Sequence, residues 1–563
     1  MTESALYAAR TTQDAPPSQF YIPAKEALSE LSTHTLKHGD TFGIFDRYGD
    51  IEPGEGSPEG LFHNDTRYLS CLRILVNGRR PLFLSSKIED NNGALSVDLT
   101  NPDLLEGENV ALQRDMVHIV RSKFLWRGAC YERLGLRNFA ATDFCIDLEI
   151  AFGADFSDIF EVRGKRRARR GELAIEVSKQ HAVIVYQGLD DVARRTILNF
   201  DPAPTRLDEK HASYRINLVA GGRASIFFVA RCVEGKVKHI DPPRNFLLAT
   251  RRARRELRNL SMGAATIETS NDVFNEALCR SMADLHMLVT ETEQGLFPYA
   301  GVPWFSTNFG RDAIITAMET LWIEPAVAKG VLKYLAATQA RETKPEADAE
   351  PGKIIHEVRR GEMARLGEVP FARYYGSVDA TPLFVVLAGL YFDRTNDFAT
   401  IFELWPSIDA ALRWINRHGD RDGDGFVEYF RAHENGLANQ GWKDSSDSIF
   451  HADGALAQGP IALCEVQGYV YAAKLAAAKI AAALGHATRA ARIAHEAEEL
   501  RAHFDEAFWC EDIGTYAIAL DGKKRRCAVR SSNAGHLLFT GIAPRERAVR
   551  VGEQLVKKPY FSG

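Results

Sequence analysis

The segment NDVFNEALCRSMADLHML, residues 271–288, marks the point at which the chain changes its pattern of apolar residues. Asn271 is of a residue type that caps helices, and the apolar residues after it recur at helical spacing. The recurring residues are Phe274, Leu278, Met282, Leu285 and Leu288. Helices are also expected over residues 311–322, 326–339, 382–394, 398–417, 461–484 and 488–508. The second half of the chain is therefore predicted to be an all-α domain.

Residues 36–235 follow a different pattern, in which apolar and polar residues alternate between short turn signals. The pairs Asn77-Gly78, Asn92-Gly93 and Gly221-Gly222 supply the positive φ angles of tight hairpins. Many such hairpins predict a large antiparallel β-sandwich. We expect an N-terminal extension over residues 1–35, a sandwich domain over 36–240, a basic linker helix over 241–265 and a helical domain over 266–563.

Composition excludes several classes of function. The 563 residues carry a net charge of −6, which gives no general attraction to nucleic acid or anionic membranes. The N-terminus lacks a secretory signal, and no apolar run is long enough to suggest a membrane span. The eight cysteines form no C-x-x-C pair, which is typical of reduced thiols in the cytoplasm. Neither a nucleic-acid nor a membrane partner is expected, and the sequence predicts no oligomeric state.

Two basic clusters, at residues 163–171 and 250–258, are the only features that favour nucleic-acid binding. No zinc-finger, RNP or Gly-rich phosphate motif accompanies them. We interpret them as a solvated hairpin and a solvated linker helix.

An acidic segment, DRDGDGFVEY, occupies residues 420–429. Asp420, Asp422 and Asp424 alternate as in the first half of a calcium loop, and Glu428 is ninth. Arg431 stands at the twelfth position, where a bidentate glutamate belongs, so Glu428 is the candidate substitute. The segment predicts either a structural calcium site or an acidic turn without an ion. No other cofactor is expected.

Long polar loops between the predicted helices are rich in aromatic and charged residues. Trp304 precedes Arg311 and Asp312, an order that suits a sugar ring: aromatic rings stack on its faces and charged groups bond its hydroxyls. In the alternative interpretation Asp312 complements a helix dipole. Asp379, in the loop before Pro382, is equally explained as a turn residue. Loops of this length inside a compact domain are usually functional.

Several segments closely resemble the bacterial amylo-α-1,6-glucosidases, which are glycogen debranching enzyme-like proteins. They are PYAGVPWFSTNFGRDAIITA (298–317), YYGSVDATPLF (374–384), NQGWKDSSDS (439–448), EVQGYVYAA (465–473) and SSNAGHLLF (531–539). GIFDRYGDI (43–51) and GLFHNDTRYLS (60–70) resemble the N-terminal domain of the same group. The resemblance implies a β-sandwich followed by an (α/α)6 barrel of helical hairpins, the fold of glucoamylases and trehalases. It also implies an inverting mechanism that uses two carboxylic acids.

The resemblance assigns roles to individual residues. Asp444, in GWKDS, corresponds to the general acid, and Trp442 would line the pocket for the sugar that is cleaved. Arg311 and Asp312 match a pair that grips the hydroxyls of the terminal glucose. The remaining pocket residues implied are Trp304, Tyr375, Asp379, Glu465 and Gln467, the last two as wall residues.

An aspartic acid can donate a proton near neutrality only if its surroundings favour the neutral form. Trp442 and Asp447 are the expected sources of that pressure on Asp444, and Lys443 is expected to point away. Asp447 remains an alternative acid at this point.

The predicted activity is an inverting glycoside hydrolase that releases glucose from α-1,6-linked branches of α-glucans or oligosaccharides. The resemblance implies that the general base lies in the last helical hairpins, so it is expected beyond Gly563. About nine helices are predicted after Asn271 rather than the twelve of six hairpins, so the barrel domain is expected to be partial. The alternatives are an α-glucosidase, a trehalase-like enzyme, a phosphorylase, or a carbohydrate-binding fragment without catalysis.

Overall fold

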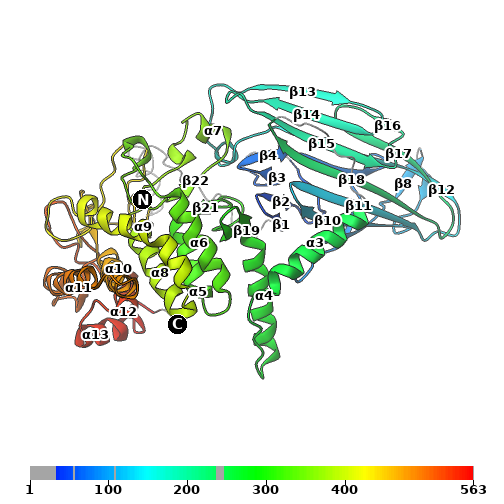
Figure 1. Cartoon of the computed structure of the whole chain (residues 1–563). Helices are drawn as coiled ribbons and strands as arrows, with labels where there is room; N and C mark the ends of the chain where they lie inside the picture. The colour runs from blue at the N-terminus through cyan, green and yellow to red at the C-terminus, as the bar shows by residue number, and fades with distance from the viewer. Residues whose placement is uncertain are drawn as a thin grey trace, which may run out of the picture.

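The computed structural model describes residues 33–558, except 53, 55–56, 107–108 and 236–245, together with residues 560–561. A region of antiparallel sheets is followed by a helical domain (Figure 1). Nearly all of the expected N-terminal extension and the first residues of the expected linker helix lie outside the described residues. None of the helices described is both long and apolar enough to cross a membrane.

Two antiparallel sheets enclose the N-terminal core. The larger has the order β13-β14-β15-β18-β11-β10-β7-β6 and the smaller β16-β17-β12-β5, and their apolar side chains form one buried cluster. A third sheet, β1-β2-β3-β4, lies beside them. The strands are β1 His34–His38, β2 Thr41–Phe45, β3 Gly60–His63, β4 Thr66–Leu69, β5 Cys71–Val76, β6 Leu82–Ile88, β7 Leu95–Thr100, β8 Leu104–Glu106, β9 Asn109–Leu112, β10 Val117–Trp126, β11 Ala129–Asn138, β12 Phe144–Gly153, β13 Glu172–Val177, β14 His181–Gln187, β15 Ala193–Asp201, β16 Arg206–Leu207, β17 His211–Leu218 and β18 Arg223–Glu234.

Of the three predicted hairpins, one joins neighbouring strands and two cross between sheets. Asn92-Gly93 connects β6 to its partner β7. Asn77-Gly78, with φ angles of 49° and 73°, makes the expected tight turn, but β5 and β6 belong to different sheets. Gly221-Gly222 likewise connects β17 to β18 across the sandwich. The turn residues fix the reversal of the chain, whereas burial of the apolar face decides which sheet receives the next strand.

The helical domain carries its long helices close to the predicted ranges. α8 packs against α10, and α10 against α11. Short strand pairs in the loops connect these helices. The elements are α4 Asp272–Leu288, β19 Val289–Thr292, β20 Gly295–Pro298, β21 Asn308–Phe309, α5 Gly310–Thr320, α6 Pro325–Thr338, β22 Glu357–Val358, α7 Glu362–Arg365, α8 Ala380–Thr395, α9 Phe398–Trp414, β23 Ala462–Leu463, α10 Cys464–Ala483, α11 Ala487–Phe508, β24 Trp509–Cys510, β25 Thr515–Tyr516, β26 Ala519–Leu520, α12 His536–Thr540 and α13 Arg545–Leu555.

Helix α4 forms where the sequence predicts it, but its apolar stripe is only partly covered. The Asn271 side chain accepts a hydrogen bond from the Phe274 amide at 3.1 Å and so caps the helix as expected. The Phe274 side chain nevertheless remains 54% exposed. Figure 1 shows why: one end of α4 projects from the body of the protein, while the other leads into β19. The buried residue of α4 is His286, near its C-terminal end.

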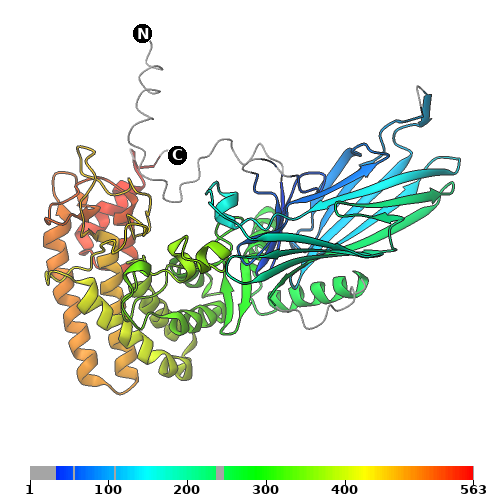
Figure 2. The ribbon, with the colours of Figure 1, turned by 90° about the horizontal axis from the view of Figure 1, so that it is seen from above.

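A buried network of charges joins the sheet region to the helical domain. Arg359 donates to Asp65 at 3.0 Å and to Glu357 at 2.9 Å. Asp158, which caps the short helix α2 (Ile159–Val162), accepts a hydrogen bond from the Met363 amide at 3.1 Å. Figure 2 shows the two parts of the chain side by side. These bonds fix the loop before α8, on which part of the candidate site depends.

The two basic clusters have different environments. Arg167, in the first, donates to Glu362 at 2.9 Å and to Glu368 at 2.8 Å. Most of that cluster is exposed, as the interpretation of a solvated hairpin requires, but Arg167 contacts the helical domain. The second cluster lies on α3 (Phe246–Ser261), whose Ala249 packs on the larger sheet while most of its arginines are exposed.

Candidate active site

Arg311 brings together three segments that are far apart in the sequence. It lies in the first turn of α5, where its Nη1 atom donates to the Gly441 carbonyl at 2.9 Å and to Asp379 Oδ2 at 3.1 Å. Its Nη2 atom lies 3.4 Å from Asp444 Oδ2. Asp312, the next residue in that turn, is half-buried. Three of the predicted residues, Arg311, Asp379 and Asp444, therefore form one group.

Asp379 is the most deeply buried member of this group. Its side chain is fully buried, and Oδ1 accepts a hydrogen bond from the Ser377 hydroxyl at 2.6 Å. It directly precedes α8, yet its carboxylate makes no capping bond to that helix. A buried carboxylate is stable when it is paired and hydrogen-bonded, and Arg311 and Ser377 meet both needs.

Asp444 is the member of the group that faces solvent. Its side chain is 43% exposed and borders a hollow of about 530 Å³ that Trp442 and Asp447 also line. Burial raises the pKa of Asp444 above its ordinary value, Arg311 opposes this rise, and the charge of Asp379 adds to it. Asp379, rather than the expected Asp447, is thus the principal like charge.

The ammonium group of Lys443 contacts neighbours other than Asp444. Its Nζ atom donates to the Ser532 hydroxyl at 3.2 Å and lies 5.3 Å from the centre of the Trp442 ring. The lysine therefore supports the indole while the neighbouring aspartic acid keeps its raised pKa.

Residues from the C-terminal part form the wall behind Trp442. The His536 ring lies 4.8 Å from that of Trp442 and bonds the Tyr469 hydroxyl at 2.8 Å. The Asn533 side chain donates to Glu465 Oε1 at 2.9 Å. Burial raises the pKa of Glu465, which is fully inaccessible, to about 7. Sequence reasoning noticed the segment that contains Asn533 and His536 but assigned neither residue a place in the site.

Three predicted pocket residues are engaged elsewhere. Gln467 donates to the Val427 and Leu463 carbonyls at 2.7 and 3.0 Å and accepts from the Val427 amide at 2.9 Å, which uses its whole side chain. The Tyr375 hydroxyl donates to the Thr338 carbonyl at 2.7 Å, and this side chain is buried. Trp304 packs in the cluster at the junction with the sheet region. The structure therefore places them in supporting positions.

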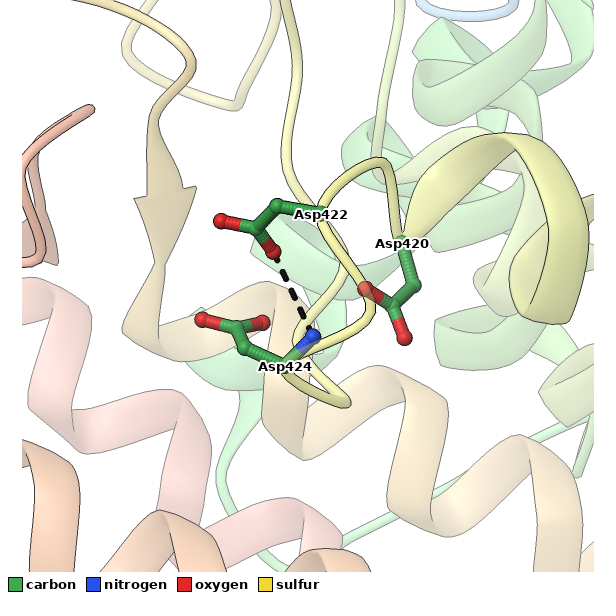
Figure 3. A group of neighbouring side chains, drawn as sticks. All are labelled: Asp420, Asp422 and Asp424. Carbon is green, nitrogen blue, oxygen red and sulfur yellow. Dashed lines mark hydrogen bonds between the residues drawn. The ribbon is translucent and has the colours of Figure 1, made fainter.

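The four acidic residues of the predicted calcium loop also gather in space. Figure 3 shows Asp420, Asp422 and Asp424 around one turn, and one oxygen of each lies within 4.8 Å of the others. The ammonium group of Lys524 lies against two of these aspartates and Glu428. Sequence reasoning missed this lysine, which is 96 residues beyond Glu428.

A cavity of about 360 Å³ lies elsewhere, between β1, α3 and α4. Its buried lysine, Lys37, donates to the Met287 and Leu288 carbonyls and to the Thr290 hydroxyl, at 3.3, 3.3 and 2.9 Å. These bonds cap the C-terminal end of α4 and leave the lysine with a structural role.

Comparison with known families covers both halves of the chain. Residues 36–229 match the N-terminal domain of some glycogen debranching enzymes. Residues 308–563 match the mannosylglycerate hydrolase MGH1-like glycoside hydrolase domain, which contains the whole Arg311–Asp379–Asp444 group. The chain therefore carries a glycoside hydrolase domain and is a glycosidase-type enzyme. The glycosidase has no match among proteins with curated functions.

Three solved structures are similar to this glycosidase. A putative kojibiose phosphorylase from the human microbiome superposes with a TM-score of 0.53 at 10% identity, over 86% of this chain and 69% of the phosphorylase. A bacterial glucoamylase complexed with acarbose gives a TM-score of 0.49 at 10% identity, over 85% and 71% of the two chains. A family 78 rhamnosidase of Bacillus sp. GL1 gives 0.42 at 12% identity, over 78% and 38%. The phosphorylase likeness identifies the helical domain as an (α/α)6-type barrel domain.

Proposed function

We propose that this glycosidase hydrolyses α-1,6-linked glucose in branched α-glucans or oligosaccharides, with Asp444 as the general acid. The observation that carries the proposal is the environment of Asp444: its side chain is 43% exposed beside the hollow, and its pKa is raised by burial and by Asp379. A glycosidic oxygen leaves only if it is protonated as the bond breaks. A carboxylic acid with a raised pKa, beside a hollow that admits a sugar, can supply that proton.

The neighbours of Asp444 account for binding and orientation. Trp442, 41% exposed, offers an apolar face on which a sugar ring can stack. Arg311 fixes the position of Asp444 and offers its charge to sugar hydroxyls. Asp379 holds Arg311 in place from below.

Inversion requires a second carboxylate about 6.5–9.5 Å from the acid, with a water between them. Asp379 and Glu465 are fully buried and already accept hydrogen bonds from Arg311 and Asn533. Neither carboxylate is exposed to the solvent that would supply this water, so we assign the base to neither of them.

The test separates proton donation from binding. Asp444→Asn is compared with the unmodified enzyme on an α-1,6-branched limit dextrin and on α-glucosyl fluoride. Fluoride leaves without protonation, so the variant is expected to lose glucose release from the dextrin and to keep hydrolysis of the fluoride. Dextrin hydrolysis at the unmodified rate would overturn the assignment of Asp444.

A second candidate is phosphorolysis of a glucoside. Lys443, Arg530 and Ser531 line the same hollow as Asp444 and offer the positive charge and hydroxyl group that a phosphate needs. Phosphate would then replace water as the nucleophile and would yield glucose 1-phosphate. Formation of this product only when inorganic phosphate is present would favour phosphorolysis over hydrolysis.

A further inference from the structure

The carboxylates of the acidic turn that begins at Asp420 accept hydrogen bonds from backbone amides of the same turn. Both oxygens of Asp420 accept backbone amides, from Gly423 at 2.8 Å and Gly425 at 3.0 Å. Asp422 and Asp424 each use one oxygen, Oδ1, in the same way, toward the amides of Asp424 and Phe426. The turn therefore leaves Oδ2 of Asp422 and Oδ2 of Asp424 free for another partner.

That partner is the ammonium group of Lys524. Its Nζ atom lies 2.8 Å from Asp422 Oδ2, 2.6 Å from Asp424 Oδ2 and 3.0 Å from Glu428 Oε2. One nitrogen is thus surrounded by three carboxylates, which are the kind of ligand that calcium prefers. The other oxygen of Glu428, Oε1, is buried and has no hydrogen-bond partner among the described residues.

The turn that presents Lys524 is itself preorganised. Asp521 Oδ1 accepts the amides of Lys523 at 3.0 Å and Arg525 at 2.8 Å. Lys524 adopts a left-handed backbone conformation, with a φ of 59°, between the bridged residues Leu520 and Arg526. A non-glycine residue in this region is uncommon and persists where its surroundings enforce it. Here they direct the side chain to the acidic turn.

We propose that Lys524 is the built-in cation of this loop: its ammonium group takes the place that a calcium ion would hold and latches the acidic turn to residues 521–526. Although partial burial lowers the pKa of Lys524, its three carboxylate partners raise that pKa overall above the ordinary value. With the ammonium group in contact with three carboxylates, the loop needs no metal ion.

The latch joins two segments that support the candidate active site. On the side of the acidic turn, the Val427 amide donates a hydrogen bond to the Gln467 side chain, and the Tyr429 hydroxyl donates one to Asn439 at 2.5 Å. Asn439 in turn donates to the carbonyl of Ser445, next to Asp444, at 2.6 Å. On the other side, β26 leads to the latch turn and pairs with β23, directly before α10 and Glu465. Opening the latch would loosen the loop that carries Asp444.

Calcium dependence of thermal unfolding tests the proposal without relying on activity. The unmodified chain is heated in EDTA and in 5 mM calcium chloride, and Lys524→Met is treated in the same way. The unmodified chain is expected to show the same Tm in both buffers. Lys524→Met is expected to lose about 4 °C or more in EDTA, because three carboxylates then repel one another, and to regain most of this loss in calcium.

Two further variants serve as controls. Lys523→Met removes the exposed neighbouring charge and is expected to change neither the Tm nor its response to calcium. Lys524→Arg retains a cation and is expected to remain insensitive to calcium. If Lys524→Met has the Tm of the unmodified chain in EDTA, the latch does not exist. A loss that calcium does not reverse shows that the ammonium group does not stand in for a cation.

Calorimetric titration of the unmodified chain with calcium provides a test that no folding defect can obscure. The proposal predicts no binding at millimolar concentration, because Lys524 already neutralises the loop. Binding of one calcium ion by the unmodified chain would overturn it.

Discussion

Arg311 Nη2 lies 3.4 Å from Asp444 Oδ2, across 133 residues of sequence. This contact places a permanent cation against the proposed proton donor and would, on its own, lower the pKa of that donor. Burial outweighs the cation, and the charge of Asp379 adds to the effect of burial, so the net pKa shift is upward. The proton affinity of Asp444 is therefore set by a balance among its neighbours, and changing one of them should change the pH dependence of the enzyme.

Asp379→Asn should move the alkaline limb of the kcat/KM profile to lower pH. A general acid acts in its protonated form, so activity falls as the pH rises through its pKa. The substitution removes the negative charge that raises the pKa of Asp444 and leaves Arg311 to lower it. The profile is measured on a branched α-glucan. An alkaline limb that stays in place, or moves upward, would show that Asp444 does not control it.

Asp447→Asn is the matched control for this profile. Asp447 borders the same hollow and is exposed, but it is not among the principal charges that shift the pKa of Asp444. The limb is expected to stay within experimental error of its original position. A larger shift than that of Asp379→Asn would make Asp447 the dominant neighbour.

Trp442→Ala should weaken saccharide binding, whereas Gln467→Ala should lower the stability of the fold. Trp442 is 41% exposed, so its loss should weaken saccharide binding by about 3- to 10-fold and leave the Tm nearly unchanged.

The Gln467 side chain is fully buried and hydrogen-bonded to the Val427 backbone. Its loss leaves these backbone groups unpaired and should cost about 1–3 kcal/mol of stability. Titration calorimetry and thermal unfolding measure the two effects. Weaker binding by a stable Gln467→Ala would return Gln467 to the pocket wall.

Glu465→Gln should change how stability depends on pH. Burial raises the pKa of Glu465 from 4.5 to about 7, so between these values the folded state holds a proton that the unfolded state releases. The contribution of Glu465 to the free energy of unfolding is therefore fully present below pH 4.5 and is lost as the pH rises toward 7. The glutamine keeps the bond from Asn533 and has no such penalty.

The stability of Glu465→Gln relative to the unmodified chain should therefore increase by about 2–3 kcal/mol between pH 5 and pH 8. Urea unfolding at the two pH values measures this difference. Asp158, whose pKa burial also raises to about 7, contributes equally to both proteins and cancels. A difference that does not change with pH would mean that Glu465 is ionised throughout this range.

Local patterns predicted the elements of the fold well. The switch of period at Asn271 and the ranges of the long helices follow from residues a few positions apart, and the structure retains them. The crossings at Asn77-Gly78 and Gly221-Gly222 were not predictable, because the same turn serves a hairpin or a corner between sheets. The exposure of Phe274 was also hidden, since periodicity shows an apolar face but not what covers it.

In the candidate site too, local sequence patterns selected residues but did not show which side chains contact one another. Arg311, Asp379 and Asp444 were all selected from the sequence, but their contact joins three segments and could be seen only in the structure. Gln467 stood two residues from Glu465 and received the same role, although its amide is used entirely on backbone groups. Lys524 was missed because no local pattern links it to a turn about a hundred residues earlier.

The central claim, that Asp444 protonates the leaving oxygen, is tested most directly by measuring one variant on two substrates. For Asp444→Asn, glucose release from an α-1,6-branched limit dextrin should fall by about 100-fold or more, while hydrolysis of α-glucosyl fluoride, which needs no proton donor, should remain within a few-fold of the unmodified rate. Equal losses on both substrates, or none on the dextrin, would contradict the claim.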